Sequence, residues 1–99
     1  MKRYVLTKDK TIYDTAKMPT IDFSNHADID KSSDNIIDLA EVGDCVECNY
    51  GLYNETYSIN NDTQLNAFKG DNTVVAIWKR NGDIMRRYSV EWMTNQEYC

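Results

Sequence analysis

Apolar and aromatic positions along the chain fall mainly in short runs with β-branched neighbours and alternating polar residues, a pattern typical of strands. The runs at residues 3–7 and 11–15 lie on either side of Lys8-Asp9-Lys10 and predict a hairpin with a loop of about three residues. Residues 45–48 and 56–60 predict two further strands. The first half and the middle of the chain therefore favour β-structure.

Two stretches interrupt the strands and predict short helical pieces. In residues 31–44 polar caps precede closely spaced apolar residues, so a short helix is expected, with a strand as the alternative. The candidate caps are Ser32, Ser33 and Asp34, and the apolar residues are Ile36, Ile37, Leu39 and Ala40. Further on, Asp62 or Thr63 would cap one helical turn that ends at Gly70. Residues 17–29 contain the only proline and are expected to form a connecting loop.

The clearest element is a C-terminal hairpin around Asn81-Gly82. Asn-Gly between two β-rich runs is the strongest short-range hairpin signal, because both central residues of a type I′ turn need positive φ. A two-residue Asn81-Gly82 loop would pair Trp78 with Met85. Alternation then gives a core face of Val75, Ile77, Ile84, Tyr88, Val90 and Trp92, with Lys79 and Arg86 near the tip. The opposite face would hold Ala76, Trp78, Arg80, Asp83, Met85 and Arg87. A bulge at Gly82 would exchange the faces of the second strand, so the register stays open.

These elements predict one domain over residues 1–99, mainly β or α+β. The expected architecture is a small barrel or roll of about five or six antiparallel strands, with a short helix or turn and the C-terminal Asn-Gly hairpin. Apolar residues are 41% and charged residues 27% of the chain, which fits an ordered domain and not a disordered tail. Polar residues interrupt the N-terminal run, so no secretory signal is indicated and a cytoplasmic location in a bacterial host is expected.

Charge is unevenly distributed along the chain. From residue 20 to residue 66, ten acidic residues face one basic residue, Lys31, so that segment carries 1 − 10 = −9. The net charge of −5 argues against direct nucleic-acid binding, because phosphate contacts need a cationic surface. The sequence therefore predicts an acidic surface that either keeps the protein soluble or binds a basic partner. Its candidate binding residues are Asp28, Asp30, Asp34, Asp38, Glu41, Asp44 and Glu47.

Candidate chemistry is sparse. Cys45 and Cys48 form a C-x-x-C, with His26 and Cys99 as further potential ligands for zinc. Residues three apart in a strand point to opposite faces, so the favoured interpretation is two reduced cysteines, Cys48 inside and Cys45 partly exposed. No P-loop, dinucleotide fingerprint or calcium loop occurs. We therefore expect no catalytic residue, no metal and no cofactor.

Three tyrosines, Tyr50, Tyr53 and Tyr57, lie in a segment with few aliphatic residues. The favoured interpretation is that they shield the edge of a small barrel. The alternative is that they serve as interface anchors, because tyrosines offer a large contact area at low entropic cost.

Residues 31–44 and the run VVAIWKRNGDIMRRY at residues 74–88 resemble stretches of small acidic proteins carried by phages and prophages of Gram-positive bacteria. The resemblance covers about the last two thirds of the chain and implies a setting, without an activity or site residues. Small acidic phage proteins are often inhibitors of host or defence machinery, and anti-CRISPR proteins are one such class.

The leading hypothesis is a non-enzymatic phage accessory protein that binds and modulates a host or defence protein. In it, the acidic residues face a basic, nucleic-acid-binding groove in an anti-CRISPR-like manner. The alternative is a small barrel that binds nucleic acid through the basic hairpin, with Trp78 as a stacking platform beside Arg80, Met85 and Arg87. No membrane partner is expected, and a homo-oligomer stays open.

Overall fold

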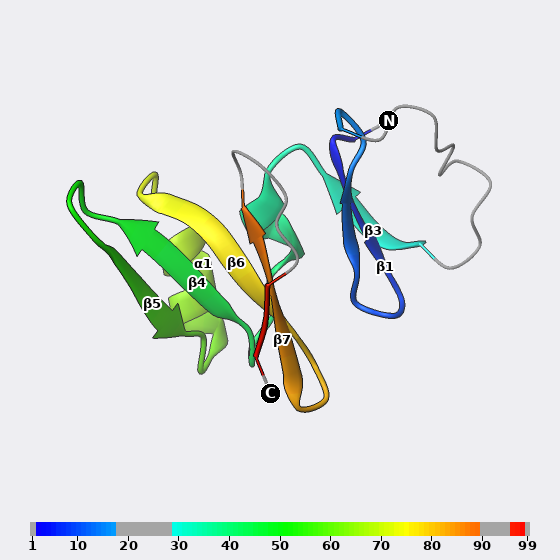
Figure 1. Ribbon diagram of the computed structural model, residues 1–99. Helices are drawn as coiled ribbons and strands as arrows, with labels where there is room; N and C mark the ends of the chain where they lie inside the picture. The colour runs from blue at the N-terminus through cyan, green and yellow to red at the C-terminus, as the bar shows by residue number, and fades with distance from the viewer. Residues whose placement is uncertain (1, 18–28, 90–95, 99) are drawn as a thin grey trace.

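The computed structural model describes residues 2–17, 29–89 and 96–98 (Figure 1). Within them the protein is mainly β, as predicted, with its strands in two antiparallel sheets. The N-terminal sheet has the order β2-β1-β3, with β1 at Tyr4–Thr7, β2 at Ile12–Asp14 and β3 at Ile29–Ser33. The C-terminal sheet has the order β5-β4-β6-β7-β8, with β4 at Cys45–Asn49, β5 at Asn54–Ser58, β6 at Val74–Asn81, β7 at Ile84–Ser89 and β8 at Gln96–Tyr98.

The two sheets do not close into the expected barrel (Figure 1). After β3 the chain turns into a 3-10 helix, η1 (Ile36–Leu39), and the next strand, β4, pairs with β5 and β6 instead of β3. Three apolar side chains of η1 are buried, so this helix supplies core contacts in the region where a barrel would need a β3–β4 pair.

Both predicted helical pieces exist, and each begins one residue away from the expected caps. η1 is capped by Asn35, whose side chain accepts from Ile37 N–H at 3.3 Å. The second, α1 (Asp62–Lys69), is capped by Asn61, which accepts from Gln64 N–H at 2.9 Å. In both cases an asparagine oxygen satisfies an amide that the helix leaves without a partner. Gly70 ends α1, as predicted.

One core joins the sheets, η1 and α1. Leu6 and Ile12 come from the N-terminal sheet, and Val46, Ile77 and Tyr88 come from the C-terminal sheet; all are buried. Ile36 and Leu39 of η1 are buried with them, while Leu65 and Phe68 of α1 pack against the same cluster. α1 therefore covers the core-facing side of the C-terminal sheet (Figure 1).

The C-terminal hairpin forms, but its loop is Gly82-Asp83 and not Asn81-Gly82. Asn81 pairs with Ile84 and Trp78 pairs with Arg87, so every partner has moved by two residues from the predicted register. Gly82 has φ of 65°, and Lys10 is the only non-glycine with positive φ in the described parts of the chain. Positive φ at the first loop residue alone is the signature of a type II′ turn.

Side chains alternate between the two faces of a strand, so a shift of two residues leaves each side chain on the face that was predicted for it. Ile77 and Tyr88 are buried on the core face as expected. Lys79, which the sequence places on that face near the tip, is buried, while Ile84 of the same predicted face is 36% exposed at the tip. Val90 and Trp92 lie outside the described residues.

Candidate functional site

Three of the seven predicted acidic binding residues are committed to internal contacts. Asp44 and Glu47 are buried. Asp44 accepts from the buried Lys79 ammonium at 2.8 Å, and Glu41 accepts from the same ammonium at 2.8 Å. That cation lowers the pKa of Glu41 from 4.5 to about 2. Glu47 pairs with Arg87 at 2.7 Å, which lowers the pKa of Glu47 as well. These carboxylates stabilise the fold and offer little charge to a partner.

Of the other four predicted acidic residues, three have exposed side chains. Asp30, Asp34 and Asp38 are exposed around β3 and η1. Asp34 accepts from Arg3 N–H at 3.0 Å and lies 3.4 Å from the Lys2 ammonium, while Asp38 accepts from the Ser33 hydroxyl at 2.6 Å. Asp28 lies outside the described residues. Within the described residues, the exposed acidic surface therefore contains three of the seven predicted residues, Asp30, Asp34 and Asp38.

The alternative basic face lacks an exposed stacking ring. Trp78 is only 6% exposed, and its indole N–H donates to Glu47 at 3.2 Å. Arg87 binds the same carboxylate, and Arg80 donates to the Gly43 carbonyl at 3.0 Å. Met85 is half-buried and lies within 3.4 Å of the Arg80 guanidinium. A nucleic-acid base has no access to the Trp78 ring in this arrangement.

The two cysteines of the C-x-x-C point to opposite faces of β4. Cys48 is buried in the core, and burial raises the pKa of its thiol; Cys45 is half-buried and lies 3.7 Å from the Ser58 hydroxyl. The placement of the two side chains, Cys48 inside and Cys45 partly exposed, is as predicted. No group of three or more potential metal ligands occurs within the described residues, which exclude His26 and Cys99.

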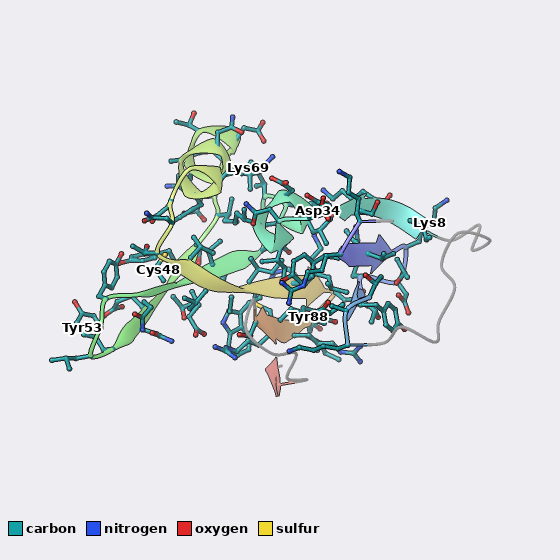
Figure 2. The ribbon with its side chains drawn as sticks, turned by 90° about the horizontal axis from the view of Figure 1, so that it is seen from above. Lys8, Asp34, Cys48, Tyr53, Lys69 and Tyr88 are labelled. Atoms are coloured by element: carbon teal, nitrogen blue, oxygen red, sulfur yellow. The ribbon has the colours of Figure 1, made fainter. Side chains whose placement is uncertain are left out.

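Four of the six large apolar side chains that are exposed within the described residues lie on the β4–β5 hairpin. Leu52 is fully exposed at the loop and Tyr53 is 57% exposed beside it, with Tyr50 and Tyr57 also open to solvent. Figure 2 places Tyr53 at the free end of this hairpin, at the opposite end of the molecule from Lys8. The sequence had singled out the three tyrosines. It did not single out Leu52, although Leu52 is the only aliphatic residue between positions 49 and 58.

The tyrosines form a continuous aromatic row with α1. The Tyr50 and Tyr53 ring centroids are 5.7 Å apart, and the Tyr50 and Tyr57 hydroxyls are hydrogen-bonded at 3.0 Å, which raises the pKa of Tyr50. The Tyr57 ring stacks on Phe68 with centroids 6.0 Å apart. Glu55 lies between Tyr53 and Tyr57 on the same face of β5 by strand alternation. We call these five residues the tyrosine face: Tyr50, Tyr53, Glu55, Tyr57 and Phe68.

A groove continues the tyrosine face between β5 and α1. It has a volume of about 360 Å³ and is lined by Tyr57, Ser58, Asn60, Gln64, Ala67 and Phe68. Its walls combine two aromatic rings with amide and hydroxyl groups. Such a groove suits a side chain that has an apolar stem and a polar end.

The tyrosine face also has a distinct charge. No lysine or arginine occurs from residue 32 to residue 68, whereas Glu55 and Asp62 are exposed in that stretch. Asp71 lies close enough to Tyr50 to contribute to the raised pKa of that phenol. Lys69, which directly follows Phe68 at the end of α1, is exposed as well, so the aromatic row has acidic neighbours along β5 and one lysine at the end of α1.

In the described parts of the chain, no helix is long and apolar enough to cross a membrane. Comparisons with protein-family models, curated proteins and solved structures give no match to this chain.

Proposed function

We propose that the protein acts without catalysis, by binding another protein through the tyrosine face and Leu52. The observation that supports this proposal is the concentration of exposed apolar side chains on one hairpin. Exposed tyrosine and leucine side chains that lie together are typical of interaction sites, and tyrosine is enriched among the residues that dominate binding energy. In the phage or prophage setting that the resemblance implies, the partner is a host or defence protein.

The binding surface in this proposal differs from the acidic segment favoured by the sequence. Glu41, Asp44 and Glu47 neutralise internal cations, so their charge is not available for docking. Asp30 and Asp38 remain exposed and are a second surface to test. Nucleic acid suits the tyrosine face poorly, because Lys69 is the only basic residue between positions 32 and 78 and one cation is too few for phosphate binding.

The test is affinity purification from infected host cells with matched variants. Leu52→Ser combined with Tyr53→Ser removes two exposed apolar side chains from the hairpin loop. Val42→Ser combined with Ile84→Ser is the control, because these exposed apolar residues lie elsewhere. We expect a specific partner that the wild type and the control retain and the hairpin variant loses by at least about tenfold. Retention by the hairpin variant, with loss in an Asp30→Lys, Asp38→Lys variant, would transfer the site to the acidic surface.

A further inference from the structure

We infer that the occupant of the β4–β5 hairpin is an extended, basic segment of the partner, which adds to the C-terminal sheet as a new strand beside β5. This inference rests on the proposed function and specifies the partner's chemistry. Its first support is the position of β5, which lies at the edge of the sheet with no strand on its outer side among the described residues. All five residues of β5 are exposed.

The edge of β5 carries one of the devices that natural edge strands use against strand addition, the charged Glu55, and lacks the others. Such edges carry charged residues or proline, contain a bulge, or are covered by another element. Glu55 opposes an acidic strand and leaves the edge open to a basic one. β5 has the sequence Asn-Glu-Thr-Tyr-Ser, and its pairing with β4 runs through all five positions without a register shift. It is therefore a regular edge whose outer backbone groups pair with no other strand in the described parts of the chain.

Two hydrogen bonds determine which of those groups point outward. Tyr50 N–H donates to the Tyr53 carbonyl at 2.9 Å, and Ile59 N–H donates to the Asp44 carbonyl at 2.9 Å. Inward and outward backbone groups alternate along an antiparallel strand. The groups directed away from β4 therefore belong to Asn54, Thr56 and Ser58, with Thr56 at the centre.

Charge identifies the occupant. The side chains of an added strand that lie on the tyrosine face would be next to Glu55 and the rings of Tyr53 and Tyr57. A lysine or arginine there gains an ion pair with Glu55 and a cation–π contact with a tyrosine ring. The groove between Tyr57 and Phe68 accommodates the aliphatic stem of a second basic side chain. The other face of β5 carries small polar side chains, from Asn54, Thr56 and Ser58. Threonine or valine side chains of an added strand can pack beside them.

A second copy of this chain is a poorer occupant. Antiparallel self-pairing centred on Thr56 would place the two Glu55 side chains on the same face, two positions apart. It would also join two molecules that each carry a net charge of −5. Like charges therefore oppose the dimer and favour a basic partner.

The experiment uses a peptide of about eight residues with alternating arginine and threonine, long enough to span β5. Amide hydrogen exchange of the full chain is followed by NMR with and without this peptide. We expect new protection at the amides of Asn54, Thr56 and Ser58, which point outward in the free protein. A peptide with glutamate in place of arginine should bind at least about tenfold more weakly.

Thr56→Pro is the sharpest variant. The Thr56 amide donates to nothing in β4, and proline is tolerated on an edge strand where its nitrogen faces solvent, so the fold should persist. Strand addition should be lost, with binding weakened by at least about tenfold. If this variant fails to fold, the same peptide with N-methyl groups at alternate residues removes the donors from the ligand and must also bind at least about tenfold more weakly.

Any of the following results would overturn the inference. One is peptide binding without protection at β5, and another is equal binding of the arginine and glutamate peptides. The third is concentration-dependent protection of the Thr56 amide without peptide, together with a dimer in sedimentation, which would make a second copy the occupant.

If the captured partner depends on Leu52 and Tyr53 but not on Glu55 or Thr56, strand addition fails while the proposed function stands. A partner independent of Leu52 and Tyr53 contradicts the proposed function itself.

Discussion

The Arg87 guanidinium holds the Glu47 carboxylate with two hydrogen bonds, from Nε to Oε1 at 3.0 Å and from Nη2 to Oε2 at 2.7 Å. The same carboxylate accepts from the Trp78 indole N–H and the Asn54 side-chain amide, at 3.2 and 2.9 Å. These residues come from β4, β5, β6 and β7. One carboxylate therefore connects four neighbouring strands of the C-terminal sheet, including the edge strand proposed as the binding site.

Replacing Glu47 with alanine should destabilise the protein strongly. Arg87 and the indole N–H would lose their acceptor in a buried site, and removal of one partner of a buried ion pair costs about 3–5 kcal/mol. Urea unfolding followed by tryptophan fluorescence measures the free energy of unfolding. Glu55→Ala is the control, because Glu55 is an exposed glutamate on the adjacent strand and should change that free energy by no more than about 0.5 kcal/mol. Equal stability of the two variants would contradict the role assigned to Glu47.

Stability should fall at acid pH because two carboxyl groups are held ionised in the folded protein. The Lys79 ammonium lowers the pKa of Glu41 from 4.5 to about 2, and Arg87 lowers the pKa of Glu47. Between the folded and unfolded pKa values the unfolded chain binds more protons, so folding is favoured above about pH 5 and loses this contribution as the pH falls towards 2.

The measurement for this prediction is the urea midpoint at a series of pH values from about 6 to 2. Glu41→Gln cannot ionise, and its unfolding free energy should therefore depend less steeply on pH than that of the wild type. Glu55→Gln, the same change at an exposed glutamate of β5, is the matched control. An unchanged slope in Glu41→Gln would show that this carboxyl does not contribute.

Lys79 should matter far more than Lys10, although both ammonium groups contact the same Glu41 oxygen, at 2.8 and 3.1 Å. Lys79 is buried and also donates to the Leu39 carbonyl and to the buried Asp44. Lys79→Met leaves the Asp44 carboxylate without its cation, and we expect a loss of about 3–5 kcal/mol in unfolding free energy. Lys10 is partly exposed, so Lys10→Met should cost at most about 1 kcal/mol. Similar losses in both variants would contradict the special position of Lys79.

Local sequence signals predicted the elements but not their long-range partners. Asn-Gly identified the C-terminal hairpin correctly. The helices η1 and α1 begin within one residue of the predicted caps, and α1 ends at the predicted Gly70. The register was wrong because the Asn81 side-chain amide donates to the Asp9 carbonyl at 2.9 Å, a contact between residues 72 positions apart. Such a contact holds Asn81 in β6 and moves the turn to Gly82-Asp83, and no short-range pattern records it.

The same limit applies to the candidate site. The tyrosines are visible in the sequence as large aromatic residues in a polar segment, but the favoured interpretation was that they shield a barrel edge, and they were not among the predicted binding residues. The acidic residues were assigned together because charge alone does not reveal which carboxylates meet an internal cation. Lys79 and Arg87, each more than 30 positions away from their acidic partners, decide that Asp44 and Glu47 face inward.

Asn81→Gly tests the turn that the structure assigns. In a type I′ turn Asn81 would need positive φ, and glycine would be neutral or stabilising there. In the observed turn Asn81 is the last residue of β6 and donates to Asp9, so glycine adds backbone entropy and removes a hydrogen bond. We expect a loss of about 1–2 kcal/mol in unfolding free energy. Gly82→Ala should lower the unfolding free energy by a comparable amount. A Cβ at Gly82 would meet no atom within 4 Å, so the loss would come from backbone strain at φ of 65°. If Asn81→Gly were as stable as the wild type, the result would contradict the Gly82-Asp83 turn and support the Asn81-Gly82 loop that the sequence predicted.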